Sequence, residues 1–426
     1  MLSTASLRPR HRPLVRLLSA EPHIPTASPQ PPPTAPRLPR ARFSPSPRSP
    51  NASHVPSASN PPFRAPFNLP HLPPTFGSNQ ILSVAPSTRA LLEEIVGTFR
   101  APIRYAFAYG SGVFEQDGNS SPNQKPMLDF IFAVNHPAHW HSINLTQNPS
   151  HYALHARLLG SSFVSRVQQV SPGVWFNAYV PMSGATIKYG VTTVDALCSD
   201  LLTWNSLYLS GRMHKPIRII KDDARVRLTQ QVNLASAART ALLTLPEKFT
   251  EQELYEQLAG FSYGGDPRMM FAENPDKIRN ITKPQQPQFR ELYHRLMSNL
   301  PGVHWPADSS IIEQDVAANA RAIHLRKLPS GLLKRTEQRY AAHFQSTGVQ
   351  VTKESDPSAF WTKVAGDAEL SKHIAEDLRA IVRWPATVQT AKGLVSAGLG
   401  KSIKYAVRKV GKWWAGGRTS GSPGNS

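Results

Sequence analysis

The sequence predicts a mixed α/β domain, a mainly helical region after it, and an amphipathic helix near the C-terminus. Strand-like apolar runs alternate with helical patterns between residues 85 and 225, which favours one mixed sheet covered by helices. From residue 226 onward the apolar residues recur mainly at helical spacing. Close to the C-terminus, apolar and basic residues separate onto opposite faces of one helix.

The first 84 residues differ in composition from the rest of the 426-residue chain. Residues 1–92 hold ten arginines, no lysine and one acid, Glu21, and twenty of the forty prolines precede residue 80. Such a segment cannot bury a core. An arginine-rich, acid-poor N-terminus is typical of an organellar transit peptide, so residues 1–84 are expected to be a mitochondrial transit peptide and a proline-rich disordered segment. A basic tail that binds nucleic acid is the alternative.

Two further features of the composition exclude classes of protein. Cys198 is the only cysteine, which excludes a disulfide framework and a cysteine-based zinc site within one chain. No run of about 18 apolar residues occurs, so no helix is expected to span a membrane. A protein of this kind that acts on lipids must do so from the membrane surface.

Residues 85–225 carry the pattern of the mixed sheet. A helix is expected over residues 91–99, where Leu91, Ile95 and Phe99 share one face, and Pro102 helps to end it. A second helix is expected over 195–210. The predicted strands cover residues 104–110, 127–134, 174–180, 185–191 and 216–220.

A second, helical domain is expected over residues 226–345. An apolar-faced helix over 229–245 stops at Pro246, and the spacing of Thr250 and Glu253 predicts a capping box that opens the next helix. A further helix is expected over 288–299, and loops and short helices over 301–345. Residues 346–426 form the predicted C-terminal region.

A glycine-serine bend followed by an acid is the most informative local pattern. Gly110, Ser111 and Gly112 follow one predicted strand, and Asp129 lies within the next. Small residues at a strand end let backbone amides and a hydroxyl approach phosphate oxygens, and a neighbouring carboxylate can hold a divalent cation against the same phosphates. The pair therefore indicates a nucleotidyltransferase site. The structural alternatives are an ordinary turn and a buried hydrogen-bond acceptor.

Several ordered blocks of sequence carry a resemblance to a known family. They are YAFAYGSGVFEQ (105–116), LDFIFAV (128–134), WHSINLTQNPSHY (140–152), IKYGV (187–191), LYLSGRMHKPI (207–217), LLTLPEKFTEQELY (242–255) and FSYGGDPRM (261–269), with Glu273, Asn274 and Lys277 after them. In these blocks the chain resembles the peripheral mitochondrial phosphatidate cytidylyltransferases, which are CDP-diacylglycerol synthases also called translocator assembly and maintenance proteins.

The resemblance implies a nucleotidyltransferase-fold domain over residues 85–225, a winged-helix-like domain over 226–345 and a C-terminal membrane-binding helix. The implied reaction converts CTP and phosphatidic acid into CDP-diacylglycerol and pyrophosphate with Mg²⁺. The implied setting is cardiolipin and phosphatidylglycerol synthesis on the matrix side of the mitochondrial inner membrane, with no nucleic acid as a partner.

The metal site needs more than one acid. Nucleotidyltransferases generally pair two carboxylates two positions apart, but here Phe130 and Ile131 follow Asp129. The remaining candidates for metal ligands are Asp200, in the helix predicted over 195–210, and Asp222, after the last predicted strand. The structural alternatives are a solvated helix face for Asp200 and a strand cap for Asp222.

Three basic residues are candidates for phosphate contacts. Lys188 lies in an otherwise apolar strand, where an unpaired ammonium is costly, so we expect it to contact a phosphate, and Lys188 and Asp129 are the candidate catalytic residues. Arg212 and Lys215 follow the predicted helix and are expected to bind pyrophosphate or the lipid phosphate, with a solvated basic loop as the alternative for Lys215. In the expected reaction a phosphatidate oxygen attacks the α-phosphorus of CTP, so positioning and charge neutralisation dominate catalysis.

Other polar residues carry less specific patterns. Arg268 and Lys277 flank Glu273 and are expected either to close over the nucleotide or lipid headgroup or to form a loop salt bridge, which is the simpler account. Another group of four polar residues shares helical spacing up to a break at Pro149. For these residues we expect structural hydrogen bonds, or a contact of an asparagine with cytosine, rather than a metal site. These four are His141, Asn144, Asn148 and His151.

The C-terminal tail predicts a helix that lies in a lipid interface. Ile403, Trp413 and Trp414 fall on one helical face and Lys404 and Arg408 on the opposite one, and no acid follows residue 377. Tryptophans at headgroup depth and cations on anionic phosphates are typical of interfacial helices. A helix that docks on the protein core would share the apolar stripe but would not need charge of one sign.

Two other functions remain open at this point. One is a nucleotidyltransferase that acts on RNA, an alternative that the net charge of +20 favours. RNA binding predicts basic residues interleaved with aromatic ones, whereas the tail separates them. The other is a non-catalytic maintenance factor for the import machinery, which predicts that Asp129 is dispensable.

Overall fold

The computed structural model describes residues 73, 75–114, 127–271, 276–347, 352–353 and 355–416, without the side chains of residues 270–271 and 397–416. Phe63–Ser426 forms one compact unit. The predicted transit peptide lies outside the described residues. The end of the proline-rich segment is ordered, because Leu82 is buried in the core and Gln80 donates hydrogen bonds to Arg227 and Gln231. The prediction of disorder is therefore wrong for residues 75–84.

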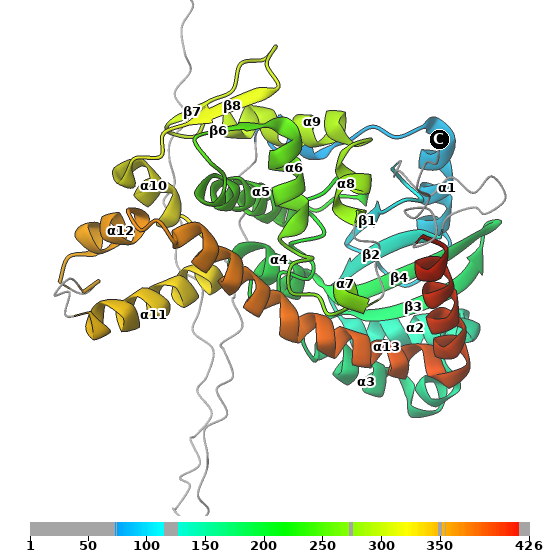
Figure 1. Ribbon diagram of the computed structural model, residues 1–426. Helices are drawn as coiled ribbons and strands as arrows, with labels where there is room; N and C mark the ends of the chain where they lie inside the picture. The colour runs from blue at the N-terminus through cyan, green and yellow to red at the C-terminus, as the bar shows by residue number, and fades with distance from the viewer. Residues whose placement is uncertain are drawn as a thin grey trace, which may run out of the picture. The chain divides into compact units, whose positions relative to one another are not determined.

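A five-stranded mixed sheet has the strand order β3-β4-β2-β1-β5 (Figure 1). β2 and β4 run parallel, and the other neighbouring strands run antiparallel. The central strands β1 and β2 are apolar on both faces, because helices cover both sides of the sheet. The five strands are β1 (Tyr105–Tyr109), β2 (Leu128–Val134), β3 (Trp175–Met182), β4 (Ala185–Thr193) and β5 (Ile217–Lys221), which confirms the five predicted runs.

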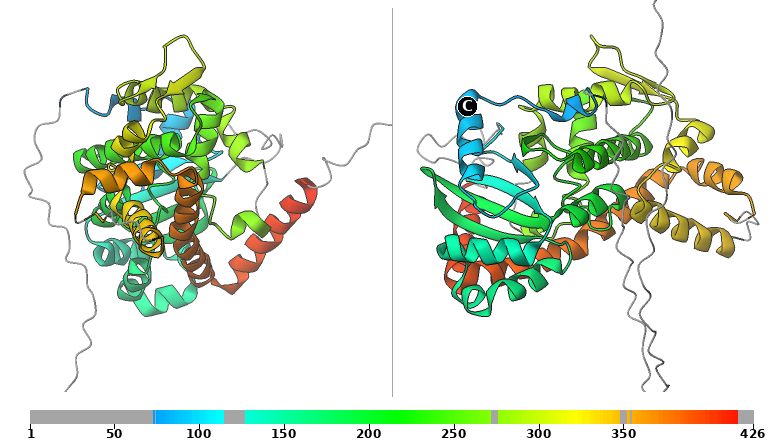
Figure 2. Two further views of the ribbon diagram at one scale, coloured as in Figure 1. Left: turned by 60° about the vertical axis from the view of Figure 1, so that its left-hand side comes forward. Right: turned by 180° about the vertical axis from the view of Figure 1, so that it is seen from behind.

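Helices pack on both faces of this sheet (Figures 1 and 2). On one face, Leu92 of α1 (Pro86–Gly97) and Trp140 of α2 (Pro137–Gln147) join the cluster around Phe130. On the other face, Leu197 of α4 (Val194–Thr203) packs with Ile131, and α5 (Ala224–Thr244) lies beside α4. α3 (Leu154–Gln169) packs on α2 and follows the short η2 (Pro149–His151). The sequence pattern did not predict α3.

The helix predicted over 195–210 ends earlier than expected. α4 stops at Thr203, since Trp204 adopts a left-handed conformation with φ 54° and Leu207 does the same with φ 53°. The segment that follows is a compact loop up to β5, and it covers the sheet face that carries Asp129. This loop, rather than a longer helix, presents Tyr208 and Arg212 to the sheet.

The region after β5 combines helices with a small sheet. The predicted capping box is confirmed, because Thr250 and Glu253 exchange both hydrogen bonds at the start of α6. A three-stranded antiparallel sheet has the order β6-β8-β7. Its members and the helices around it are β6 (Lys248–Thr250), β7 (Val303–His304), β8 (Ile311–Gln314), α6 (Glu251–Gly260), α7 (Arg268–Phe271), α8 (Lys277–Thr282), α9 (Gln286–Met297), α10 (Ala318–Leu325) and α11 (Ser330–Ser346). The 17-residue α11 contradicts the expectation of only short helices over 301–345.

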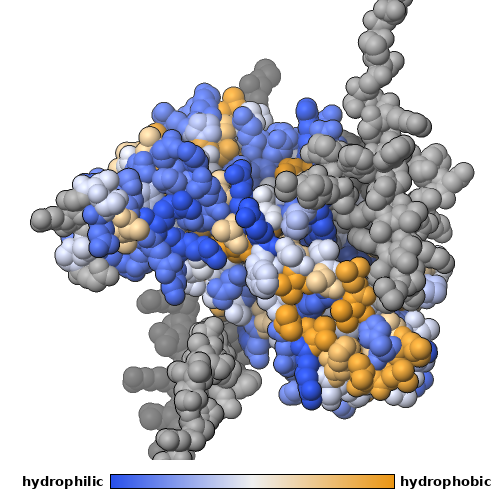
Figure 3. All heavy atoms as spheres, turned by 60° about the horizontal axis from the view of Figure 1, so that its bottom comes forward, coloured by the Kyte–Doolittle hydropathy of each residue, from blue (hydrophilic) through white to orange (hydrophobic). Residues whose placement is uncertain are grey.

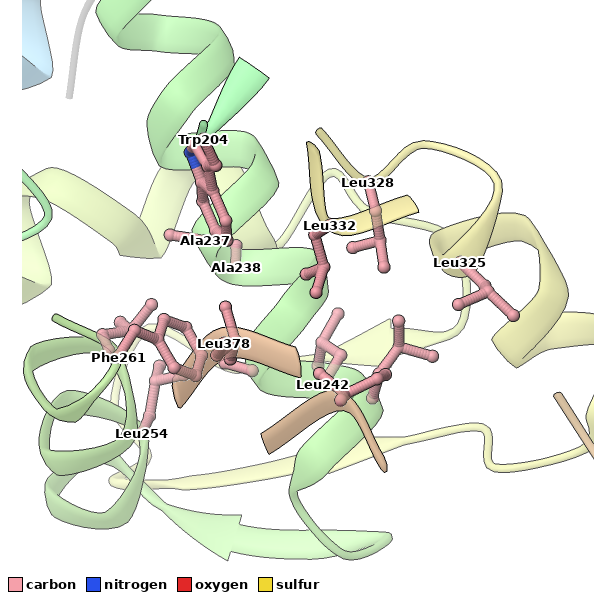
Figure 4. Close-up of a cluster of buried hydrophobic side chains, with 14 of the residues drawn as sticks. Trp204, Ala237, Ala238, Leu242, Leu254, Phe261, Leu325, Leu328, Leu332 and Leu378 are labelled. Carbon is pink, nitrogen blue, oxygen red and sulfur yellow. The ribbon is translucent and has the colours of Figure 1, made fainter. Parts of the chain in front are cut away.

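One apolar cluster joins this helical region to the loop after α4 (Figure 4). Trp204 lies against Ala237 and Ala238 of α5, and the same cluster includes Leu254 of α6 and Leu378 near the C-terminus. Leu82 and Phe114 belong to it as well. The predicted second domain therefore shares its core with residues from the predicted first domain, which fixes the loop that carries Arg212.

The C-terminal region contains α12 (Pro357–Ala365) and the 47-residue α13 (Leu370–Gly416), which contains Pro385. α13 packs against α11, α5, β3 and α3. Its last part includes the predicted membrane-binding residues Ile403, Lys404, Arg408, Trp413 and Trp414, so their helical backbone is confirmed, whereas their side chains lie outside the described residues. Within the described residues, no helix is long and apolar enough to cross a membrane.

Candidate functional site

The predicted bend and the predicted acid lie side by side. β1 and β2 pair so that Tyr109 is opposite Asp129, and Gly110 follows at once. Gly110 has φ 84°, a backbone conformation that favours glycine, and its carbonyl oxygen accepts hydrogen bonds from the amides of Val113 and Phe114 at 3.0 Å. A Cβ atom at Gly110 would lie 3.6 Å from Asp129 Oδ2, so the turn and the carboxylate share one location.

Gly112 holds the bend against the start of β2. A Cβ atom there would lie 2.8 Å from the side chain of Leu128 and 3.0 Å from the carbonyl oxygen of Met127. A larger residue here would displace the end of the Leu128 side chain and crowd the Met127 carbonyl oxygen. Ser111, between the two glycines, is half-buried. The Gly-Ser-Gly sequence thus brings the backbone of the bend close to the strand that carries Asp129.

Lys188 pairs with Asp129 across two parallel strands. β2 and β4 place the two residues in register, and Lys188 Nζ lies 3.1 Å from Asp129 Oδ1. Each side chain keeps about a quarter of its surface exposed, at 25% and 23%. The ammonium also lies 4.8 Å from the centre of the Phe176 ring. The sequence predicted a cation in this strand, and the structure places it on the predicted acid.

Arg212 reaches the same place from the loop after α4. Its guanidinium carbon lies 3.8 Å from the centre of the Tyr208 ring and 5.8 Å from that of Tyr109, and its Nε donates to the Tyr109 hydroxyl at 3.4 Å. Burial raises the pKa of Tyr109, while the charges of Lys188, Asp129 and Arg212 also act on it. Tyr109 therefore stays a neutral phenol between the acid and the guanidinium.

Lys215 extends this cationic group toward the helical region. Its Nζ donates to the carbonyl oxygen of Gly211 at 2.6 Å and to Ser262 Oγ at 2.9 Å, and lies 4.8 Å from the centre of the Tyr263 ring. Burial lowers the pKa of Lys215 well below its usual range, and repulsion from other cations, Lys277 among them, adds to this. A solvated basic loop does not describe Lys215.

The loop after α6 adds an ion pair beside these cations. Arg268 Nε lies 2.9 Å from Asp266 Oδ1, and the Asp266 side chain is buried. Although burial acts against the charged form, hydrogen bonds from Arg268 lower the pKa of Asp266. The predicted salt bridge thus involves Asp266, while Glu273 lies outside the described residues. Lys277 lies 5.3 Å from the centre of the Tyr263 ring, which Lys215 also contacts, and the charge of Arg268 acts on Arg212.

Asp200 does not join Asp129. Its Oδ1 accepts hydrogen bonds from the Ser206 amide and hydroxyl and the Leu207 amide, and its Oδ2 accepts from the amides of Leu209 and Ser210 and the Ser210 hydroxyl, at 2.7–3.1 Å. A carboxylate offers about four lone-pair positions. Six donors already use them, so the structure speaks against Asp200 as a metal ligand. Its role is to shape the loop that leads to Arg212.

Asp222 lies at the opposite end of the sheet from Asp129. β5 runs antiparallel to β1, so Ile217 pairs with Tyr109 at the site, whereas Lys221 pairs with Ala106 and Asp222 follows it. The Asp222 carboxylate forms an ion pair with Arg227. The structure therefore does not bring Asp222 to the bend, because the direction of β5 carries its end away from Gly110.

The residues predicted to make structural hydrogen bonds do so. His141 bonds to the Tyr152 hydroxyl and to Gln168, both at 2.8 Å, and Asn144 donates to the hydroxyls of Tyr152 and Tyr189 at 2.9 Å. Burial lowers the pKa of His141 to about 4. His151 and Asn148 complete the network through Tyr189 and Asn144. This network lies inside the protein and supports the sheet face opposite Asp129.

Acids are scarce around Asp129. Among the residues that the structure describes, no group of three or more His, Cys, Asp and Glu side chains is arranged to hold a metal ion. A pocket of about 620 Å³ lies between α6, α8 and α13, but its lining includes none of the predicted site residues. The site is thus one carboxylate, a glycine bend and a group of cations, an arrangement suited to a polyanionic ligand.

Sequence comparisons give a consistent assignment. The profile of the family described as "Phosphatidate cytidylyltransferase, mitochondrial" matches residues 92–412. A protein of that name from Xenopus laevis is 39% identical over 335 residues, which cover 78% of this chain and 96% of the relative. The Danio rerio protein of the same name is 38% identical over 76% of this chain and 94% of its own length.

The Saccharomyces cerevisiae protein of that name is 42% identical over 232 residues, which cover 53% of this chain and 60% of the relative. All of the site residues discussed above lie inside the profile match. The chain therefore belongs to the family of mitochondrial phosphatidate cytidylyltransferases, which are transferases.

Proposed function

We propose that this protein transfers the cytidylyl group of CTP to phosphatidic acid and releases pyrophosphate. The observation that carries the proposal is the contact between the Gly110 bend and Asp129, with Lys188 on the same carboxylate. A phosphatidate oxygen forms a bond to the α-phosphorus of CTP while the bond from that phosphorus to the bridging oxygen of the β-phosphate breaks. The products are CDP-diacylglycerol and pyrophosphate.

Different residues of the site are proposed to bind or neutralise different phosphate groups. The amides and the Ser111 hydroxyl of the bend are proposed to bind the triphosphate, since little side-chain bulk separates them from a ligand. Lys188 and Arg212 are proposed to neutralise charge on the reacting phosphates, and Lys215 to bind the pyrophosphate or lipid phosphate. The contacts of the half-buried Lys215 support this role, because an Nζ held by Gly211 and Ser262 is already positioned.

Mg²⁺ is the proposed cofactor, with Asp129 as its protein ligand. Mg²⁺ commonly takes one or two carboxylates and completes its coordination with substrate phosphates and water. The donor set at the bend, one partly exposed carboxylate among cations, fits such a metal better than a fully protein-bound one. When bound, the ion would neutralise phosphate charge and help to orient the α-phosphorus.

We further propose a nucleotidyltransferase fold for residues 85–225 and a winged-helix-like fold for residues 226–345. The mixed sheet with a glycine bend after its first strand supports the former. The grouping of α5, α6 and α9 with the sheet β6-β8-β7 supports the latter. In this arrangement the second region supplies Ser262, Tyr263 and Arg268 to the edge of the site.

The proposed location is the matrix side of the mitochondrial inner membrane, where CDP-diacylglycerol would serve cardiolipin and phosphatidylglycerol synthesis. The arginine-rich, acid-poor N-terminus supports import, and the relatives carry a mitochondrial name. The basic helix that ends α13 supports attachment to an anionic membrane surface.

The test is a turnover assay with labelled CTP, Mg²⁺ and vesicles that contain phosphatidic acid. The expected product is labelled CDP-diacylglycerol, formed with one pyrophosphate for each lipid. A parallel reaction with RNA in place of lipid should incorporate no label. Incorporation into RNA, or no lipid product under any condition, would contradict the proposal.

A further inference from the structure

Helix α3 exposes an unusual amount of apolar surface. Leu154, Leu158 and Leu159 are 61%, 77% and 58% exposed, although leucine side chains in a folded chain are ordinarily covered. Gly160, with φ 75°, introduces a kink directly after them. Figure 3 looks at the end of the molecule that carries α3 and the second half of α13, and apolar side chains gather there in one area.

α13 adds to the same surface. The buried Lys392 of α13 donates to the carbonyl oxygens of Gln168 and Val170 at 3.2 and 2.7 Å, and so fixes α13 to the end of α3. Two and three residues further on, Leu394 is 63% and Val395 41% exposed. Val170 itself is 51% exposed. The exposed apolar residues of the two helices therefore belong to one docked pair.

The charge of this surface has one sign. No Asp or Glu occurs between Asp129 and Asp195, a stretch that includes all of α3, and none follows Asp377 in α13. Arg157 and Arg166 of α3 are exposed. Apolar side chains next to cations, without any acid, match the headgroup region of an anionic bilayer.

We propose that the exposed faces of α3 and of residues 392–396 form a membrane-docking surface that inserts into an anionic bilayer; this rests on the proposed function, which requires a lipid substrate. We call this surface the α3/α13 face, defined by Leu154, Leu158, Leu159, Val170, Leu394 and Val395. The basic end of α13 follows Val395 in the sequence.

One helix connects the α3/α13 face to the site. A Cβ atom at Gly265 would lie 2.2 Å from the carbonyl oxygen of Arg379, so α13 touches the loop that carries Ser262 and Arg268. Leu394 follows Arg379 by fifteen residues, which corresponds to roughly 22 Å of helix. Docking of the α3/α13 face would therefore hold the site at a fixed height above the lipid headgroups.

The first experiment measures binding of the full chain to vesicles of equal parts phosphatidylcholine and phosphatidylglycerol. Leu158→Ser combined with Leu159→Ser should weaken flotation at least roughly tenfold, because two apolar side chains lose their burial in lipid. The matched control is Val316→Ser with Ile323→Ser, which are 42% and 49% exposed near and in α10, at a distance from α3 (Figures 1 and 2). The control should bind like the unmodified chain.

A second measurement does not depend on how well the serine variant folds. Cys198 is the only cysteine and is buried, so Leu158→Cys can carry a single environment-sensitive dye. Its emission should shift to the blue with the same vesicles, and the same dye on Ile323→Cys should not respond. No shift at Leu158, or equal shifts at both positions, would overturn the proposal.

Turnover separates this inference from the proposed function. The Leu158→Ser, Leu159→Ser variant should lose activity on phosphatidic acid in vesicles and keep it on a soluble short-chain phosphatidic acid. If the unmodified chain converts neither lipid, the proposed function fails while the binding result still stands. If the variant changes the chain from dimer to monomer without changing vesicle binding, the α3/α13 face belongs to a second copy, and the membrane proposal is overturned.

Discussion

Lys188 and Asp129 face each other on neighbouring parallel strands, and their charged groups meet 3.1 Å apart beside the bend at Gly110. The Lys188 ammonium therefore orients the Asp129 carboxylate. In the proposed reaction a metal ion with phosphates would compete with this ammonium for Asp129 Oδ1. Lys188 would then have two effects, one on metal affinity and one on the charge of the bound phosphates.

Lys188→Met should separate these two effects. We expect turnover to fall roughly 100-fold, because one cation that neutralises phosphate charge is lost. The Mg²⁺ concentration needed for half-maximal activity should not rise, since the competitor for Asp129 has been removed. The measurement is a Mg²⁺ titration of initial rates. A variant that needs much more Mg²⁺ would show that Lys188 does not compete for the carboxylate.

Asp200→Asn should affect stability and leave the metal dependence unchanged. The six hydrogen bonds to this carboxylate include four backbone amides, and an amide side chain cannot accept all of them. We expect a loss of about 3 kcal/mol in the free energy of unfolding by urea. Asp195→Asn, at the exposed start of the same helix, is the control and should cost at most about 1 kcal/mol. A shifted Mg²⁺ titration in Asp200→Asn would restore the metal-ligand assignment.

Gly112→Ala should lower turnover through the position of β2. The added methyl group would meet the end of the Leu128 side chain at 2.8 Å and the Met127 carbonyl oxygen at 3.0 Å, so the start of β2 or the bend shifts slightly next to Asp129. A displacement of about 1 Å at a reacting group can cost roughly 100-fold in rate. Gly97→Ala, whose added methyl group would meet nothing within 4 Å, is the control and should keep full activity. Equal rates in both variants would refute the close-approach argument.

The buried His141 should make the free energy of unfolding depend on pH. Its pKa is about 4 in the folded state against an ordinary value of 6.5, so the unfolded chain binds more protons between these two values. The stability from the neutral ring is present above pH 6.5 and is lost as the pH falls toward 4. From pH 7 to pH 5 this group alone should cost about 2 kcal/mol in the free energy of unfolding.

Urea titrations at both pH values, in the unmodified chain and in His141→Gln, measure this cost. Glutamine keeps a polar side chain near Tyr152 and Gln168 but does not titrate in this range. The variant should therefore show a smaller loss between pH 7 and pH 5. An equal loss in both proteins would assign the acid sensitivity to other groups.

The strands could be predicted from sequence because their cause is local. Runs such as residues 105–109 and 128–134 are apolar on both faces, and few other structures accept that pattern. The glycine bend and Asp129 could be predicted together for the same reason, since the bend directly follows one strand and the acid lies in the next. Their antiparallel pairing then brings them into contact.

The errors arise from contacts between residues distant in sequence or from strand order. α4 stops at Thr203 because the loop after it folds back onto Asp200, a tertiary feature that helical periodicity does not contain. Asp222 was misplaced because sequence does not give the direction of β5 relative to β1. α3 lacks a clear amphipathic pattern, since three of its leucines face outward.

The site residues that sequence reasoning missed are aromatic. Tyr109 and Tyr208 hold Arg212 between them, and Tyr263 lies beside Lys215. Each of these tyrosines lies in a block that carried the family resemblance, in strand 105–109 or in the segments 207–217 and 261–269. Their contacts depend on the fold of the loop after α4, so only the assembled structure brings them to the cations.

The rate of CDP-diacylglycerol formation in Asp129→Asn, compared with Asp222→Asn, tests the central claim most directly. Both substitutions remove one negative charge from a residue in an ion pair, but only Asp129 lies at the bend. The account predicts a loss of at least roughly 100-fold for Asp129→Asn and near-normal turnover for Asp222→Asn. Normal turnover in Asp129→Asn, or an equal loss in Asp222→Asn, would contradict it.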